Sequence, residues 1–136
     1  MIAANCEMNF GFRPLPGMDS KNMLAEMVKL GHDLNYDDSD FELTPAFFGP
    51  TLPAANQDFD SAYHRAEQLA LNCGLTVGPA VDFWTEASLF SQAGMTALVY
   101  GPGDIVQAHT ADEWVEIKQL DTVVNQYIHM IEQAAN

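Results

Sequence analysis

The sequence from Thr96 to Trp114, TALVYGPGDIVQAHTADEW, is the most informative part of this chain. It begins with a short apolar run, residues 97–100, which is typical of a buried β-strand. The Gly-Pro-Gly sequence that follows ends the strand, and a long amphipathic stretch comes after the loop. We therefore expect His109 in a loop between a strand and a helix, where α/β proteins usually hold their functional side chains.

Three further strands are predicted. Apolar and polar side chains alternate over residues 6–13, so this segment is expected to be a half-buried strand with Arg13 on its polar face. The sequence PLPG then turns the chain. Shorter strand patterns occur at residues 41–44 and 75–77.

Four amphipathic helices are predicted from the spacing of the apolar residues. The first starts at Asp19 or Ser20 and should stop at Gly31, and the second starts at Asp58 and should stop at Gly74. Thr85 is expected to cap a short third helix. The last helix carries an apolar stripe of Ile117, Leu120, Val124, Tyr127, Ile128 and Ile131. The alternation of helices and strands predicts an α/β fold, and the Pro- and Gly-rich segment 47–56 predicts a linker between two units.

The charge of the chain excludes some classes of partner. Nineteen acidic residues against five basic ones give a net charge of −14, so nucleic acid and anionic membrane surfaces would repel it. No run approaches the roughly 18 apolar residues that span a bilayer. The two cysteines lack a CxxC spacing, so we expect buried free thiols and a reducing, cytoplasmic location.

Candidate functional residues are few. His109 precedes Asp112 and Glu113, and an imidazole with a nearby carboxylate is a common metal ligand. A zinc site needs at least three protein ligands, however, and a single loop histidine is more often structural. Arg13 has a planar guanidinium that can donate two hydrogen bonds to one carboxylate. An arginine at the surface of a strand more often binds no ligand, however. Thr85 could bind an anion at a helix start or serve only as a cap. The other three histidines are expected at the surface.

Four segments together resemble the zinc-dependent amino-acid deacylases, a family that includes acetylornithine deacetylase, acetylcitrulline deacetylase and succinyl-diaminopimelate desuccinylase. These segments are CEMNFGFRPLPGM (6–18), FFGPTLP (47–53), VDFWTEASLFSQAG (81–94) and the stretch 96–114. The likeness is greatest to the acetylornithine and acetylcitrulline branch.

The resemblance implies a strand-helix-strand part of a lid or dimerisation domain at residues 1–51. Residues 52–136 would be the C-terminal α/β part of a zinc-hydrolase catalytic domain. It also implies that His109 is a metal ligand, that Arg13 holds the substrate carboxylate and that Thr85 lines the substrate pocket. The expected complete protein is a cytoplasmic homodimer that acts on an N-acyl amino acid.

The chain departs from this family in what it lacks. The other metal ligands and the glutamate general base have no counterpart here, and Met1 to Ala3 resemble the interior of a longer protein. We therefore expect a fragment of a deacetylase of arginine biosynthesis that uses two zinc ions, or cobalt or manganese, and that is inactive and metal-free by itself. The alternative is a remnant of the family without catalytic activity, which dimerises or binds a small molecule.

Overall fold

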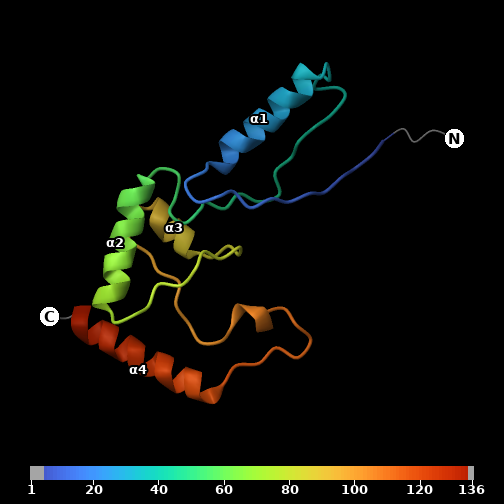
Figure 1. Cartoon of the computed structure of the whole chain (residues 1–136). Coiled ribbons are helices and arrows are strands. Elements are labelled where there is room, and N and C mark those ends of the chain that lie inside the picture. The colour runs from blue at the N-terminus through green and yellow to red at the C-terminus, as the bar shows by residue number, and fades with distance from the viewer. Residues whose placement is uncertain (1–4, 135–136) are drawn as a thin grey trace.

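The structure is a computed structural model that describes residues 5–134, and Met1 to Ala3 lie outside the described residues. Within that range the order of elements is α1 (Ser20–Asp33), α2 (Phe59–Asn72), α3 (Ala87–Gln92), a 3-10 turn η1 (Ile105–Gln107) and α4 (Ile117–Ala134). Figure 1 shows these helices joined by long extended segments. None of the helices described is long and apolar enough to cross a membrane.

The predicted strands are not formed. Residues 6–13, 41–44, 75–77 and 96–100 have no strand assignment, and no backbone hydrogen bond between described residues joins one of these segments to another. A strand is stable only when its N–H and C=O groups pair with a neighbour. The described residues are therefore helical with extended connections, and the strand-helix-strand and α/β expectations are not confirmed.

The second predicted helix is confirmed with both of its ends. The Asp58 carboxylate accepts a hydrogen bond of 3.0 Å from the Ser61 N–H, and the Ser61 hydroxyl and N–H hold the pKa of Asp58 below its usual range. Gly74 follows the helix with a φ of 70°, a left-handed conformation that glycine adopts without strain.

Two predicted helix ends are wrong. α1 continues through Gly31 to Asp33, and the left-handed residue after it is Asn35, with a φ of 65°. α3 begins at Ala87 with Glu86 before it and no side-chain cap. Thr85 instead uses its carbonyl oxygen, which accepts from the Ser88 N–H and hydroxyl. A residue with several possible local partners cannot be assigned one of them from spacing alone.

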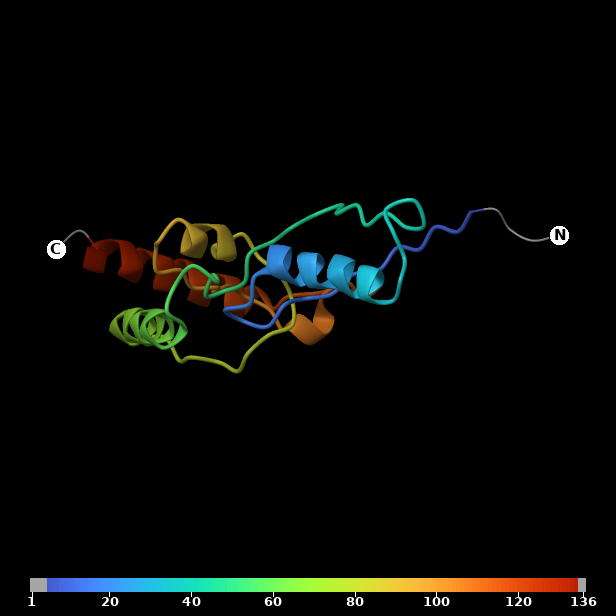
Figure 2. The same ribbon diagram turned by 90° about the horizontal axis from the view of Figure 1, so that it is seen from above.

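Few side chains are buried. Figure 2 shows the helices spread in a shallow layer rather than wrapped around a common centre. The buried residues among those described are Thr51, Ala54, Ala62, Ala70, Ser88, Ser91 and Val123. Cys6 is exposed and Cys73 half-buried, so the expectation that both thiols are buried is wrong.

The best-buried part of the chain is the segment 49–57, called here the central junction. Ala54 is only 1% exposed and its N–H donates to the Ser91 hydroxyl at 3.1 Å. That hydroxyl also accepts from the Gln57 side-chain amide at 3.0 Å. The Thr51 hydroxyl accepts from the Gly17 N–H at 3.1 Å and donates to the Pro53 carbonyl at 2.7 Å.

The central junction also holds the aromatic side chain of Trp84. The indole N–H donates to the Pro50 carbonyl at 3.1 Å, and the ring meets Phe47 edge-on with centroids 5.2 Å apart. The Ser20 hydroxyl donates to the Gly49 carbonyl at 3.1 Å. Although its composition is that of a linker, this segment therefore connects the start of α1 to α3.

Replacing Ser91, a residue that is 3% exposed, with Ala removes the hydroxyl that accepts two hydrogen bonds. We expect the free energy of unfolding to fall by about 1–3 kcal/mol, because the Ala54 N–H is left buried without a partner. Urea titration followed by helical circular dichroism measures the loss. Thr44→Ala is the matched control, since the Thr44 hydroxyl bonds only to the exposed Glu42. Equal midpoints for the two variants would refute the role given to Ser91.

Candidate functional site

His109 lies in an exposed loop that follows η1. Its backbone is left-handed, with a φ of 62°, and its N–H donates to a carboxylate oxygen of Glu113 at 3.1 Å. The Thr110 hydroxyl donates to the Gln107 carbonyl at 2.7 Å and closes the same turn. A left-handed conformation is uncommon outside glycine, so these bonds hold the loop in an unusual shape.

The imidazole of His109 has no hydrogen bond to another described residue, because Glu113 contacts the backbone of His109 rather than its ring. Among the described residues, no group of three or more His, Cys, Asp or Glu side chains is placed to hold a metal ion. Within residues 5–134, His109 is therefore an exposed histidine that belongs to no complete metal site.

Thr85 is half-buried at the edge of an open hollow of about 400 Å³. Glu86 and Phe90 line the hollow on the α3 side, and the extended residues 95–100 line it on the other. Sequence patterns assigned residues 96–100 only to a strand. Their position beside Thr85 depends on how α3 packs, and no local signal could have shown it.

Arg13 is exposed near the end of the extended N-terminal segment, and its side chain has no hydrogen bond or ion pair within residues 5–134. Figure 1 shows that this segment and the loop after η1 lie apart. No polar contact joins any two of His109, Arg13 and Thr85 in the described structure. The structure therefore does not bring the three predicted site residues together.

The remaining histidines do not add to a site. His32 lies in α1, 3.1 Å from a carboxylate oxygen of Asp38. His64 lies on α2, 3.8 Å from the Glu67 carboxylate, with 70% of its side chain exposed. His129 is exposed on α4. The expectation that these three residues lie at the surface is confirmed.

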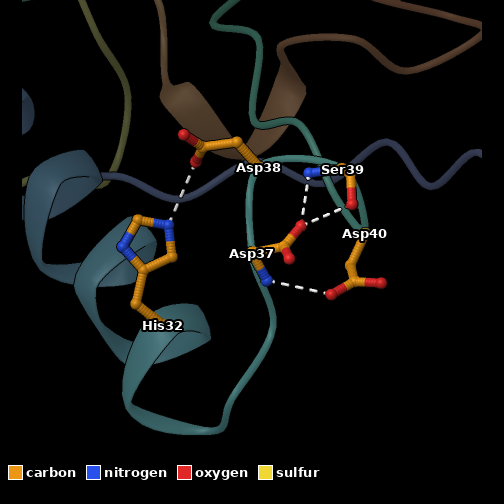
Figure 3. A network of polar contacts seen from close by, with 5 residues as sticks. All are labelled: His32, Asp37, Asp38, Ser39 and Asp40. Atoms are coloured by element: carbon orange, nitrogen blue, oxygen red, sulfur yellow. Dashed lines mark hydrogen bonds and ion pairs between the residues drawn. The ribbon is translucent and has the colours of Figure 1, made fainter.

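The acidic run 37–40 forms a solvent-exposed turn, shown in Figure 3. The Asp37 carboxylate accepts from both the hydroxyl and the N–H of Ser39, and these bonds lower the pKa of Asp37. The Asp37 N–H in turn donates to Asp40 at 2.9 Å. The carboxylates of Asp37 and Asp40 therefore satisfy the turn's own hydrogen-bond donors, which is a structural role.

Comparison with known proteins identifies relatives over nearly the whole chain. The model of peptidase family M20/M25/M40 matches residues 9–133. The N-acetyl-L-citrulline deacetylase of Xanthomonas campestris pv. campestris is 49% identical over 127 residues, which are 91% of this chain and 33% of that protein. The acetylornithine deacetylases of Salmonella arizonae and Salmonella agona are each 33% identical over 134 residues, 94% of this chain and 33% of theirs.

The chain thus spans about a third of the length of these curated relatives. The family match covers far more than half of its residues, and it agrees with the resemblance seen in the four sequence segments. This chain belongs to peptidase family M20/M25/M40.

Proposed function

We propose that this chain is part of a metal-dependent hydrolase that removes the acyl group from an N-acetyl amino acid, either N-acetylcitrulline or N-acetylornithine. The names of the relatives support both the reaction and the substrates. The greater identity to the citrulline enzyme favours N-acetylcitrulline. The activity belongs to arginine biosynthesis on this proposal.

The single observation that carries the proposal for the site is the free imidazole of His109, held by a strained loop with its ring facing solvent. On this proposal His109 supplies one ligand, and the other ligands and the general base come from parts of the complete protein outside these 136 residues. Zinc is the proposed metal, with cobalt or manganese as substitutes. Such a metal pair polarises an acyl carbonyl and lowers the pKa of a bound water.

Arg13 is proposed to bind the α-carboxylate of the substrate. Its guanidinium makes no contact within the described chain, so it is available to a ligand, and its geometry suits a carboxylate bidentately. Thr85 is proposed to line the substrate pocket, which its position at the 400 Å³ hollow supports.

The proposal extends to the complete protein. Residues 1–51 would belong to a lid that forms a homodimer, and residues 52–136 would belong to the catalytic domain. The two free cysteines support a reducing, cytoplasmic location. The net charge of −14 continues to argue against nucleic acid and anionic lipid as partners.

The role of His109 is tested in a chimera in which this chain replaces the aligned third of the Xanthomonas deacetylase. We expect His109→Ala to remove about one of the two bound zinc ions, since a metal site with a missing ligand binds its metal more weakly. We also expect kcat to fall by a factor of about 10³ or more, because the remaining ligands no longer hold the metal in its catalytic coordination geometry. Metal content is measured by atomic emission and turnover with N-acetyl-L-citrulline. His64→Ala is the matched control, because it removes an exposed imidazole from α2. Full zinc content in His109→Ala would overturn the assignment.

The role of Arg13 is tested in the same chimera. Arg13→Ala should raise KM for N-acetyl-L-citrulline by a factor of about 10–100, because a hydrogen bond to a charged group contributes about 1.5–3 kcal/mol. Steady-state kinetics separate KM from kcat, and zinc content should not change. Arg65→Ala is the control, since it removes an exposed guanidinium that donates to the Gln57 side chain at 2.8 Å. An unchanged KM in Arg13→Ala would show that this arginine does not touch the substrate.

The chain by itself should show no deacetylase activity, because one imidazole cannot hold a catalytic metal ion. Purified 136-residue protein is assayed with N-acetyl-L-citrulline and N-acetyl-L-ornithine in the presence of zinc or cobalt. Turnover that is lost in His109→Ala would contradict this expectation. A different outcome is that the chain is inactive and that the chimera is also inactive but still binds N-acetyl-L-citrulline. That outcome would favour the alternative, in which the chain is a small-molecule-binding remnant of the family.

A further inference from the structure

The loop that carries His109 is closed by contacts between its own residues. The Asp104 carboxylate accepts from the Val106 N–H at 3.0 Å, and the Asp104 carbonyl accepts from the Gln107 N–H at 2.9 Å. The Gln107 carbonyl in turn accepts from the Thr110 hydroxyl at 2.7 Å. Each of these bonds joins residues that are close together in the sequence, so the shape of the loop is set locally.

The backbone N–H of His109 has a different kind of partner. No backbone–backbone hydrogen bond between described residues involves His109, and its N–H donates to the Glu113 carboxylate at 3.1 Å. The other left-handed residue in the described range that is not glycine is Asn35, whose N–H donates to the His32 carbonyl at 2.9 Å. The turn after α1 is therefore held by the backbone, whereas the N–H of His109 is held by a side chain.

The left-handed backbone decides where the imidazole of His109 points. The angles φ and ψ fix the direction of the Cα–Cβ bond and the rotamers that are open to the side chain. With a φ of 62°, the imidazole leaves the chain in a direction that an extended or right-handed residue would not give it. Residues other than glycine populate this region sparsely, so contacts around them must hold it. The bond to Glu113 is the hydrogen bond that His109 itself makes.

The carboxylate of Glu113 does not have the role that the sequence suggested. A carboxylate beside a metal-binding histidine commonly accepts from the second ring nitrogen and fixes the tautomer, but Glu113 accepts from the backbone of His109. A backbone N–H needs only an acceptor oxygen, which the side-chain amide of glutamine also offers. A metal ligand or an ionic partner of the ring would need the charged carboxylate. The two roles therefore predict different results for Glu113→Gln.

We propose that Glu113 is a positioning residue for His109: it accepts the His109 N–H, keeps the backbone left-handed and so orients the imidazole. The bond is made within the described chain, so this orientation exists before a metal ion or any further polypeptide is bound. That the orientation serves metal binding rests on the proposed function, whereas the hydrogen bond and its effect on the backbone do not.

The first test needs no metal. Exchange of the His109 amide proton with water is measured by NMR in the isotope-labelled chain of 136 residues. We expect Glu113→Ala to speed this exchange at least about tenfold, because it removes the acceptor that protects the amide. Glu113→Gln should stay within about threefold of the parent, which separates loss of the acceptor from loss of the charge. The backbone carbon chemical shifts of His109 report whether its φ changes with the bond.

Glu116→Ala is the matched control for both tests. Glu116 is another exposed glutamate, close to the same loop. It accepts from the Gln119 and Leu120 N–H groups through its backbone carbonyl, which alanine keeps, so the exchange rate of the His109 amide should not change. Because Glu113 and Glu116 are both exposed, all three variants should keep the helical circular dichroism of the parent.

The second test uses the chimera with the Xanthomonas deacetylase. Glu113→Ala should weaken zinc binding about 10–100-fold, which is the usual loss when a residue that orients a metal ligand is removed. Glu113→Gln and Glu116→Ala should both stay within about threefold of the parent. Zinc affinity is measured by competition with a chromophoric chelator, in the absence of substrate.

Three results would overturn the inference. The first is a His109 amide that exchanges equally fast in the parent and in Glu113→Ala. The second is a Glu113→Gln chimera that loses zinc as Glu113→Ala does, which would assign Glu113 a role that needs its charge. The third is zinc affinity that His109→Ala lowers and Glu113→Ala does not. The proposed metal ligand fails on another result, full zinc content in His109→Ala, so the two failures are distinguishable.

Discussion

The fold depends on the hydrogen bonds of the Ser91 and Thr51 hydroxyls at the central junction. Ser91 accepts from the Ala54 N–H and from Gln57, and Thr51 accepts from the Gly17 N–H. These bonds link segments more than 30 residues apart in the sequence, and they lie at the few buried positions of the chain. Elsewhere the helices are joined by extended segments with little packing, so the junction sets where α1 and α3 lie and, through α3, where the hollow beside Thr85 opens.

The absence of strands in residues 5–134 and the exposure of apolar side chains on α4, such as Val124 and Ile128, have one physical cause. Both a strand and an amphipathic helix stabilise a protein only when a neighbour covers their apolar face or pairs with their backbone. Within the described residues, the segment 96–100 makes no backbone–backbone hydrogen bond, and Ile117, Val124 and Ile131 on α4 are more than half exposed. The imidazole of His109 and the guanidinium of Arg13 likewise have no hydrogen bond or ion pair within residues 5–134.

The family match gives the class of protein, and the geometry gives the positions and exposure of the side chains. The match over residues 9–133 establishes the family, and the names of the relatives suggest a reaction. The geometry shows an exposed histidine, His109, in a loop with a left-handed backbone, an exposed Arg13, and Thr85 at the edge of a hollow. Among the described residues, no three His, Cys, Asp or Glu side chains are placed to hold a metal ion together.

The sequence by itself determined the family, the four helices, the Asp58 cap and the glycine after α2, because these depend on residues within one or two turns of each other. It also identified His109 as a loop residue, since a strand-breaking Gly-Pro-Gly sequence stands just before it. The tertiary structure alone decided which face of α4 is buried, that the segment 49–57 hydrogen-bonds to the start of α1 and to α3, and that Thr85 bonds through its carbonyl. These features depend on contacts between distant segments, such as Ala54 with Ser91 and Tyr127 with Tyr100, and a local pattern of apolar and polar residues does not specify its distant partner.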